Sequence, residues 1–289
     1  REAEIPVWHD DQQGTATVLL AGLINALKIV GKEMARIKVA LIGVGAANVA
    51  TYRLLKAGGI DAGAIVACDS RGTLHAGRDD IQARQEAFAD KWRICRESNA
   101  EGIVGGPAEA MRGADVVIAL SKPGPGTIKP AWVEGMAQDA IVFPCANPVP
   151  EIWPWEAKQA GARIVGTGRS DFPNQLNNSL GFPGIFRGVL DVRASTITDE
   201  MALAAAEELA ACAEERGIHE DNLIPTMDDW DVFPREAVAT AMKAQEQGLA
   251  RVQKSPQEIY EHAQAVIHQA RNTAHMMMAQ GLIPQPPES

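Results

Sequence analysis

Five short apolar segments alternate with longer helical segments through the first two thirds of the chain. Short, almost continuously apolar strands that are separated by helices are typical of a parallel sheet covered on both faces. The pattern therefore predicts an α/β fold, with a doubly wound parallel sheet and helices on both of its faces. The five predicted strands are KVALIG (38–43), AIVACD (64–69), DVVIAL (115–120), AIVFPCA (140–146) and ARIVGTG (162–168).

Helical patterns lie on either side of this alternation. Residues 15–31 place leucines and isoleucines at helical spacing and end at Gly31, which can adopt a left-handed C-cap. From residue 198 onward the pattern is helical throughout. Ser255 and Glu258 form a capping-box signature at the start of the last helix. The predicted C-terminal helices span 198–215, 234–252 and a segment that begins at 255.

The first strand is followed by the glycine-containing loop GVGAAN, which opens a helix. Gly43 permits a tight turn, and Gly45 lets a pyrophosphate approach the N–H groups of the helix N-terminus. Asp69 ends the second strand, 21 residues after Asn48, where an acid can bind ribose hydroxyls. This context predicts a Rossmann-type dinucleotide site, although an ordinary strand–helix turn is the alternative. The cofactor-binding candidates here are Gly43, Val44, Gly45, Ala46, Ala47, Asn48, Asp69 and Ser70.

Two features of this loop leave the cofactor open. Asn48 stands where a third glycine is usual, so helix and strand are expected to pack less closely. Asp69 favours NAD, whereas Ser70 and Arg71 directly after it can accept the extra phosphate of NADP. We therefore expect NAD or NADP.

Near the N-terminus, the stretch IPVWHDDQQGTA contains two adjacent carboxylates, Asp10 and Asp11. Like charges side by side repel each other unless water separates them or a cation neutralises them. The pair is therefore either a solvated helix cap or part of a cation site. A second polar cluster follows the fifth strand, and its side chains are donors suited to a carboxylate or hydroxyl ligand. They are Arg169, Asn174, Gln175, Asn177 and Asn178. Its alternative is a surface loop whose amides bind their own backbone.

Composition limits the partners. The 289-residue chain carries a net charge of −10, which argues against nucleic acid and an anionic membrane. The sequence contains no uninterrupted apolar stretch of about 18 residues and no signal-peptide pattern. Four widely spaced cysteines are typical of reduced core thiols and of a cytoplasmic protein. They are Cys68, Cys95, Cys145 and Cys212.

The motifs PVWHDDQQGTA, GVGAAN, CANPVPEI and TGRSDFPNQLNNSLGFPGIFRG occur in order along the chain. Together they resemble the bacterial and archaeal malic enzymes, which oxidise and decarboxylate malate with NAD(P) and Mg²⁺ or Mn²⁺. The resemblance implies that Asp11 is a metal ligand, that Asp10 lies beside it in the catalytic site, and that Thr15 lies near the cofactor. It also places Asn147 against cofactor and malate, and Asn177 and Asn178 against malate.

Members of that family carry an N-terminal domain with a tyrosine acid, a lysine base and a Glu-Asp metal pair, none of which follows Arg1. We therefore expect residues 1–32 to lead from such a domain, 33–190 to bind the dinucleotide and 191–289 to form a helical segment. The isolated chain is expected to bind nucleotide without turning over malate, and the protein to form a homodimer or higher homo-oligomer. The alternatives are a metal-independent amino-acid or hydroxy-acid dehydrogenase and a non-catalytic nucleotide-binding module.

Overall fold

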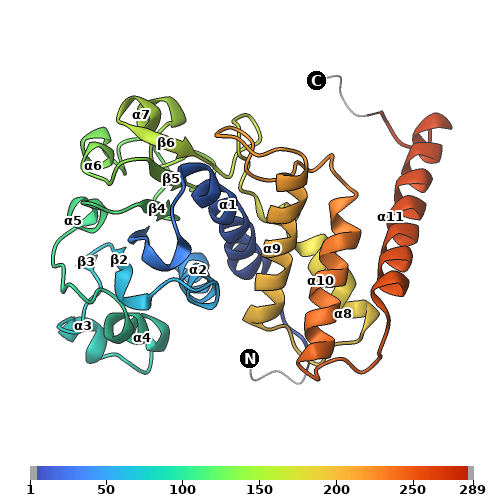
Figure 1. The fold of residues 1–289 in the computed structure, drawn as a ribbon, viewed down its shortest axis with the longest axis horizontal. Helices are drawn as coiled ribbons and strands as arrows, with labels where there is room; N and C mark the ends of the chain where they lie inside the picture. Colours follow the sequence, from blue (N-terminus) through green and yellow to red (C-terminus); the bar gives the residue numbers. More distant parts are fainter. Residues whose placement is uncertain (1–4, 286–289) are drawn as a thin grey trace.

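The computed structural model describes residues 5–285, so the outermost four residues of the segments 1–32 and 191–289 lie outside the described part. A six-stranded sheet runs in the order β3-β2-β1-β4-β5-β6, with every pair parallel except β2 and β3 (Figure 1). This arrangement confirms the predicted α/β fold. The strands are β1 Val39–Ile42, β2 Ile65–Asp69, β3 Gly72–Thr73, β4 Val116–Ala119, β5 Ala140–Pro144 and β6 Ala162–Val165.

The five predicted strands are all present, and the edge strand β3 is the exception that the apolar pattern missed. The chain turns back directly after Asp69 and pairs Thr73 with Cys68 in antiparallel register. A two-residue strand is too short to show alternation, which explains why it escaped the sequence prediction. The sheet is therefore mixed rather than purely parallel.

Alternate residues of the central strands point into two separate cores. In β1, Val39 and Leu41 join the core that contains α1, α2 and α9, whereas Ala40 and Ile42 join the core under α5, α6 and α7. Because both faces of the sheet are covered, its strands contain almost no polar residues. The helices around the sheet are α1 Thr15–Val30, α2 Ala46–Ala57, α3 Asp79–Gln82, α4 Ala89–Glu97, α5 Pro107–Met111, α6 Pro130–Glu134 and α7 Pro154–Gln159, with short helical turns at η1 Asp10–Gly14, η2 Met34–Arg36, η3 Ala62–Ala64 and η4 Asn178–Leu180.

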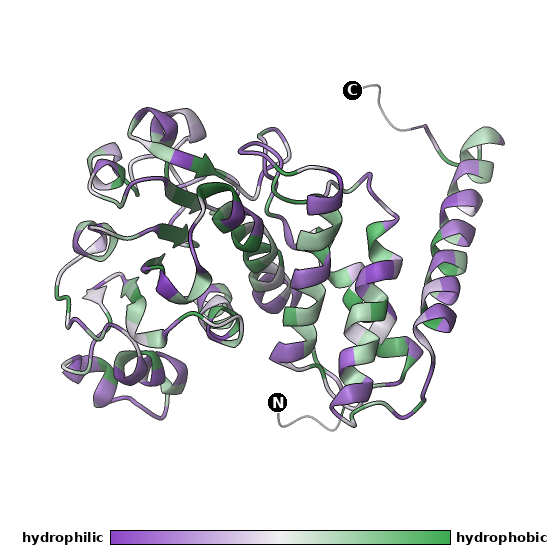
Figure 2. Ribbon diagram, viewed as in Figure 1, coloured by the Kyte–Doolittle hydropathy of each residue, from purple (hydrophilic) through white to green (hydrophobic). Residues whose placement is uncertain are grey.

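Helix α1 lies between the sheet and α9 and is buried on nearly all of its faces (Figures 1 and 2). Its C-cap residue Gly31 is left-handed at φ 67°, as predicted. Among the described residues, Asp10–Val30 is the one helical stretch long and apolar enough to cross a membrane, but 67% of its most apolar window is buried inside the protein. The packing of α1 therefore accounts for its apolar composition.

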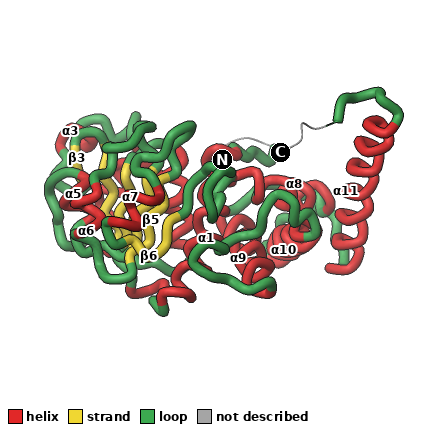
Figure 3. Tube along the Cα trace, turned by 90° about the horizontal axis from the view of Figure 1, so that it is seen from above, coloured by secondary structure: helices red, strands yellow, loops and turns green. Residues whose placement is uncertain are grey.

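The C-terminal helices pack on one another and form the other half of the molecule (Figure 3). Ser255 and Glu258 make the predicted capping box. Helix α10 begins earlier than predicted and ends six residues sooner, because the chain turns at Gly248 with φ 69°. The helices are α8 Phe182–Asp191, α9 Asp199–Glu215, α10 Val232–Glu246 and α11 Pro256–Ala279. All four cysteines are free and buried, as the sequence indicated.

Candidate functional site

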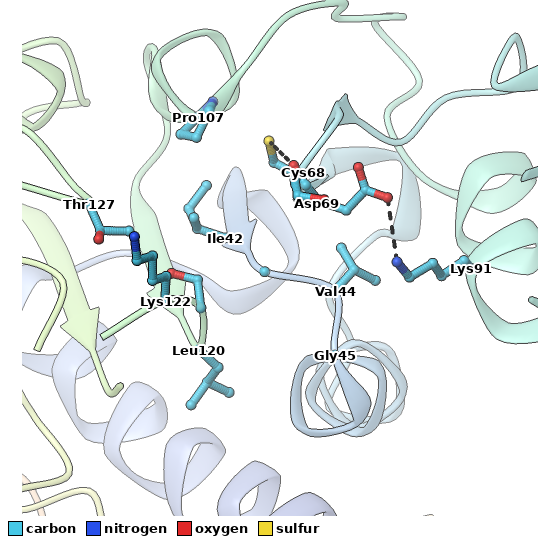
Figure 4. Close-up of a pocket in the computed structure, with 13 residues that line it drawn as sticks. Ile42, Val44, Gly45, Cys68, Asp69, Lys91, Pro107, Leu120, Lys122 and Thr127 are labelled. Atoms are coloured by element: carbon cyan, nitrogen blue, oxygen red, sulfur yellow. Dashed lines mark hydrogen bonds and ion pairs between the residues drawn. The ribbon is translucent and has the colours of Figure 1, made fainter. Parts of the chain in front are cut away.

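A cavity of about 470 Å³ opens at the carboxyl ends of β1, β2 and β4 (Figure 4). It lies above the N-terminus of α2, whose first backbone N–H groups have no partner within the helix. Lys91 and Lys122 line the same cavity, so its walls suit an anionic ligand. The remaining lining comes from Ile42, Gly43, Val44, Gly45, Cys68, Asp69, Ser70, Pro107, Leu120, Ser121 and Thr127.

The two loop glycines serve different purposes. Gly43 has φ 88°, and a Cβ atom there would lie 2.5 Å from the carbonyl oxygen of Leu120, so both conformation and space require glycine. Gly45 has an extended backbone, and a Cβ atom added there would meet no protein atom within 4 Å. Gly45 therefore leaves open the space through which a ligand can approach the start of α2.

Asn48 lies beneath the loop and is buried. Its Nδ2 donates to the carbonyl oxygens of Ile42, at 3.1 Å, and Gly43, at 2.7 Å. A residue with a small apolar side chain at this position could not make these two hydrogen bonds. Here the asparagine side chain occupies that space and ties the first turn of α2 to the end of β1. Asn48 therefore shapes the loop from below and does not line the cavity.

Asp69 is held by cationic neighbours. Arg78 donates to both of its carboxylate oxygens, at 3.1 and 3.2 Å, and Lys91 Nζ lies 3.4 Å from Oδ2 (Figure 4). Burial opposes ionisation of Asp69, but the hydrogen bonds from Arg78 and from the Arg71 backbone N–H outweigh it and lower the pKa of the carboxyl. Asp69 is therefore a fixed anion at the rim of the cavity.

Asp69 also lines a separate cavity of about 350 Å³. Ser70 and Arg71, the residues that the sequence singled out for an additional phosphate, both line it. Arg84, between α3 and α4, and Lys91 of α4 add two more positive charges, and Asp80, which lies 3.2 Å from Arg71, also lines this cavity. Asp69, which can bind ribose hydroxyls, thus lies beside cationic side chains that can bind a phosphate.

A smaller cavity of about 240 Å³ adjoins the first one, since Leu120 and Ser121 line both. This cavity brings together residues from four distant segments, all named by the sequence analysis: Asp11, Thr15, Ala47, Asn147, Asn177 and Asn178. Three of the predicted site residues do not line either of these two adjoining cavities, namely Asp10, Ala46 and Asn48.

Asp10 and Asp11 lie in η1, a π-helical turn that runs directly into α1, and their carboxylates have different surroundings. Asp10 is half-buried and accepts hydrogen bonds from Asn178 Nδ2 and, at 3.5 Å, from Trp8 Nε1. Burial raises the pKa of Asp10. Asp11 is exposed to the small cavity. The described residues contain no cluster of three or more His, Cys, Asp or Glu side chains that could hold a metal.

The polar loop after β6 separates into structural and cavity-facing amides. Asn174 is buried and binds the backbone of Val165, Glu220 and Leu223, so for this residue the alternative of backbone satisfaction is the right one. Arg169 forms a bidentate ion pair with Asp171 and donates to the Pro148 carbonyl oxygen. Asn177 and Asn178 both line the small cavity, and their side chains also have partners inside the protein. Asn177 caps η4, donating to the Gly168 carbonyl oxygen at 3.2 Å and accepting from the Ser179 N–H at 3.0 Å, and Asn178 donates to Asp10.

The sequence missed the charged residues that reach the site from elsewhere. Arg78 and Lys91 lie 9 and 22 positions after Asp69, in segments without a recognisable motif. Ser121 and Lys122 directly follow the strand β4, and their position at the carboxyl end of a parallel strand is the signal that points to them.

The chain is similar to known proteins over most of its length. Residues 12–246 match the family model described as "Malic enzyme, NAD binding domain". The chain is 45% identical over 265 residues to the bifunctional malic/malolactic enzyme of Bacillus subtilis, covering 90% of this chain and 62% of that protein. It is 39% identical over 268 residues to the NADP-dependent malic enzyme of Halomonas elongata, covering 86% of this chain and 60% of that protein.

Solved structures agree with this similarity. The malic enzyme of Entamoeba histolytica superimposes with a TM-score of 0.95 at 51% identity, covering 99% of this chain and 59% of that one. The malic enzyme of Pyrococcus horikoshii gives a TM-score of 0.90 at 48% identity, covering 97% of this chain and 64% of that one. The chain thus spans somewhat less than two thirds of the length of each of these relatives.

Proposed function

The chain belongs to the malic enzyme family, matching its NAD-binding domain, and on this premise we propose that it forms the dinucleotide-binding part of an enzyme that oxidatively decarboxylates malate to pyruvate and CO₂. The observation that carries this proposal is the junction at Leu120 and Ser121, where the cavity over the glycine loop adjoins the small polar cavity. A dinucleotide in the first cavity would place its reactive end toward a substrate in the second.

Each group of residues has a defined task in this proposal. The N–H groups at the start of α2 bind the pyrophosphate, and Asp69 accepts hydrogen bonds from the adenosine ribose. Asn147, Asn177 and Asn178 supply amide donors for the malate carboxylates and the nicotinamide end. The dinucleotide, when bound, accepts the hydride from C2 of malate.

The Mg²⁺ or Mn²⁺ requirement is a separate part of the proposal. Asp11 supplies one carboxylate at the edge of the small cavity, and Asp10, which does not line it, binds Asn178, which does. Divalent cations of this kind are held by several oxygen ligands. The described residues do not complete such a set. We propose Asp11 as one contributing ligand in the whole protein and derive no step of the reaction through the metal.

The described chain also lacks obvious proton-transfer groups in the small cavity. Of the residues that line it, only Asp11 and Cys145 are titratable. Burial raises the pKa of the Cys145 thiol well above its usual range, which makes it a poor base. We therefore propose that this chain binds dinucleotide but does not oxidise malate unaided.

The choice of dinucleotide follows from the surroundings of Asp69. We propose that the site accepts NAD or NADP, with Ser70 and Arg71 receiving the additional phosphate of NADP in the 350 Å³ cavity. Arg71→Ala should then weaken NADPH binding at least about fivefold and leave NADH binding within twofold. Equal losses for the two dinucleotides would contradict this assignment.

We further propose that residues 33–190 and 191–289 form separate domains. We also propose that the protein is cytoplasmic and forms a homo-oligomer. Support for self-association comes from apolar side chains exposed on α8 and near the end of α11, such as Leu190 at 64% and Met276 at 58%. Light scattering on the purified chain at several concentrations measures the oligomeric state directly.

The proposal is tested by calorimetric titration of the purified chain with NADH and NADPH, followed by assay of NAD(P)H formation with malate and Mn²⁺. We expect binding of at least one dinucleotide without turnover. Absence of binding by a folded chain would refute the dinucleotide site. Robust turnover would show that the proton-transfer groups lie within this chain.

A further inference from the structure

Glu151 is a fully buried carboxyl group that has no part in the function proposed above. It lies four residues after Asn147, beneath the loop that follows β5. Its Oε1 accepts hydrogen bonds from the backbone N–H of Ser121, at 2.8 Å, and from the Ser121 hydroxyl, at 2.9 Å. Its Oε2 accepts a hydrogen bond from the backbone N–H of Ala146, at 3.1 Å. One side chain therefore joins the loops that follow β4 and β5.

These two loops meet where the two cavities adjoin. Ser121 lines both cavities, and Asn147, the residue after Ala146, lines the smaller one. The Asn147 side chain also packs closely against Gly168, where an added Cβ atom would lie 3.4 Å from its amide. Any change in the separation of Ser121 and Ala146 would therefore move Asn147 relative to the dinucleotide cavity.

Backbone hydrogen bonds also tie the same loops together, from the Gly124 N–H to the Val149 carbonyl oxygen and from the Ile128 N–H to the Glu151 carbonyl oxygen. The loops would stay attached at these points if the carboxyl group were altered. The Glu151 carboxyl group is thus placed to set the spacing of the loops at Ser121 and Ala146.

We propose that Glu151 is a positioning residue that fixes Ser121 and Asn147 at the junction of the two cavities and so aligns the nicotinamide end of the bound dinucleotide. This inference rests on the proposed dinucleotide site. Among the described residues, Glu151 itself makes no hydrogen bond to the glycine loop or to Asp69. The adenosine end of the ligand should therefore bind independently of Glu151.

The replacement Glu151→Gln tests this separation. An amide has one acceptor oxygen and one NH₂ group, so its NH₂ must face either the Ser121 donors or the Ala146 N–H, and two donors then oppose each other. Calorimetry should show NADH or NADPH binding weakened at least about tenfold. ADP, which occupies only the adenosine and phosphate part of the site, should bind within twofold of the wild-type affinity.

Two further variants keep the test decisive. Glu151→Asp retains both acceptor oxygens but shortens the side chain, so it should give the same selective loss if the glutamine variant does not fold. Glu134→Gln, an exposed carboxyl on α6 that lines neither cavity, is the matched control and should change neither affinity.

Each outcome decides the proposal. Selective loss of dinucleotide binding supports it. Equal weakening of ADP and dinucleotide, unchanged dinucleotide binding, or failure of both Glu151 variants to fold would overturn it, since Glu151 would then have a general structural role or none. If the wild-type chain binds neither ligand, the dinucleotide site itself is wrong and this inference fails with it.

Discussion

Replacing Gly45 by valine should separate ligand binding from folding. The backbone at Gly45, with φ −85° and ψ −177°, accepts a β-branched residue, and the added Cβ atom would meet no protein atom within 4 Å. As the N-cap of α2, Gly45 makes no side-chain capping bond, so its replacement should cost at most about 1 kcal/mol. The melting temperature should then fall by no more than about 2–4 °C.

The effect on binding should be larger, because the valine side chain would project into the space that a pyrophosphate needs. A hydrogen bond to a charged group contributes about 1.5–3 kcal/mol, and loss of one such bond from the α2 N–H groups weakens binding by roughly tenfold or more. Calorimetry with NAD(P)H measures this loss. Gly135→Val is the matched control, since a Cβ atom there makes ordinary contacts, 3.5 Å from Trp132 O, and lies outside both cavities. Unchanged affinity in a folded Gly45→Val chain would refute the reasoning.

Three further predictions use other parts of the site. Gly43→Ala should lower the free energy of unfolding by about 1–3 kcal/mol, because φ is 88° and the Cβ atom would overlap Leu120 O; unchanged denaturant stability would show that the loop can relax. In a complete enzyme, Asp11→Asn should raise the Mg²⁺ or Mn²⁺ concentration for half-maximal activity while NAD(P)H affinity stays constant, and an unmoved metal requirement would leave Asp11 as a solvated acid in the first turn of η1. Burial raises the pKa of Glu236, so the native state binds more protons than the unfolded state above about pH 4, and stability falls as pH rises from there toward the native pKa. Glu236→Gln should therefore stabilise the chain more at pH 8 than at pH 5, and an equal effect at both values would contradict the assignment.

The local sequence was enough to predict features whose conformation depends on one segment alone. The five longer strands were predictable because nearly all of their residues are buried, and Gly43 and Gly45 because a turn between strand and helix imposes its own requirements. The capping box at Ser255 and Glu258 is equally local. These features need no knowledge of the rest of the chain.

Residues whose roles depend on distant partners were not predictable in this way. Asn174 and Asn177 are three positions apart in one polar loop and both bind backbone groups, yet Asn177 also lines the small cavity and Asn174 does not. Arg78 and Glu151 act on Asp69 and Ser121, and nothing in their own neighbourhoods indicates those contacts. The family resemblance selected Asn177 and Asn178, which the residue pattern alone left undecided.

The burial of α1 also has a consequence for the order in which the chain folds. Asn25 of α1 donates to the carbonyl oxygens of Ala210 and Leu223, and the first of these partners is 185 residues farther along the chain. At a synthesis rate of about 5–20 residues per second, α9 leaves the ribosome roughly 10–40 s after α1. The apolar face of α1 that packs on α9 stays uncovered during that time. We expect α1 amides to be protected from hydrogen exchange in stalled chains that expose residue 224 and unprotected in those that expose only residues up to 195. A nascent α1 would therefore be a natural binding site for chaperones.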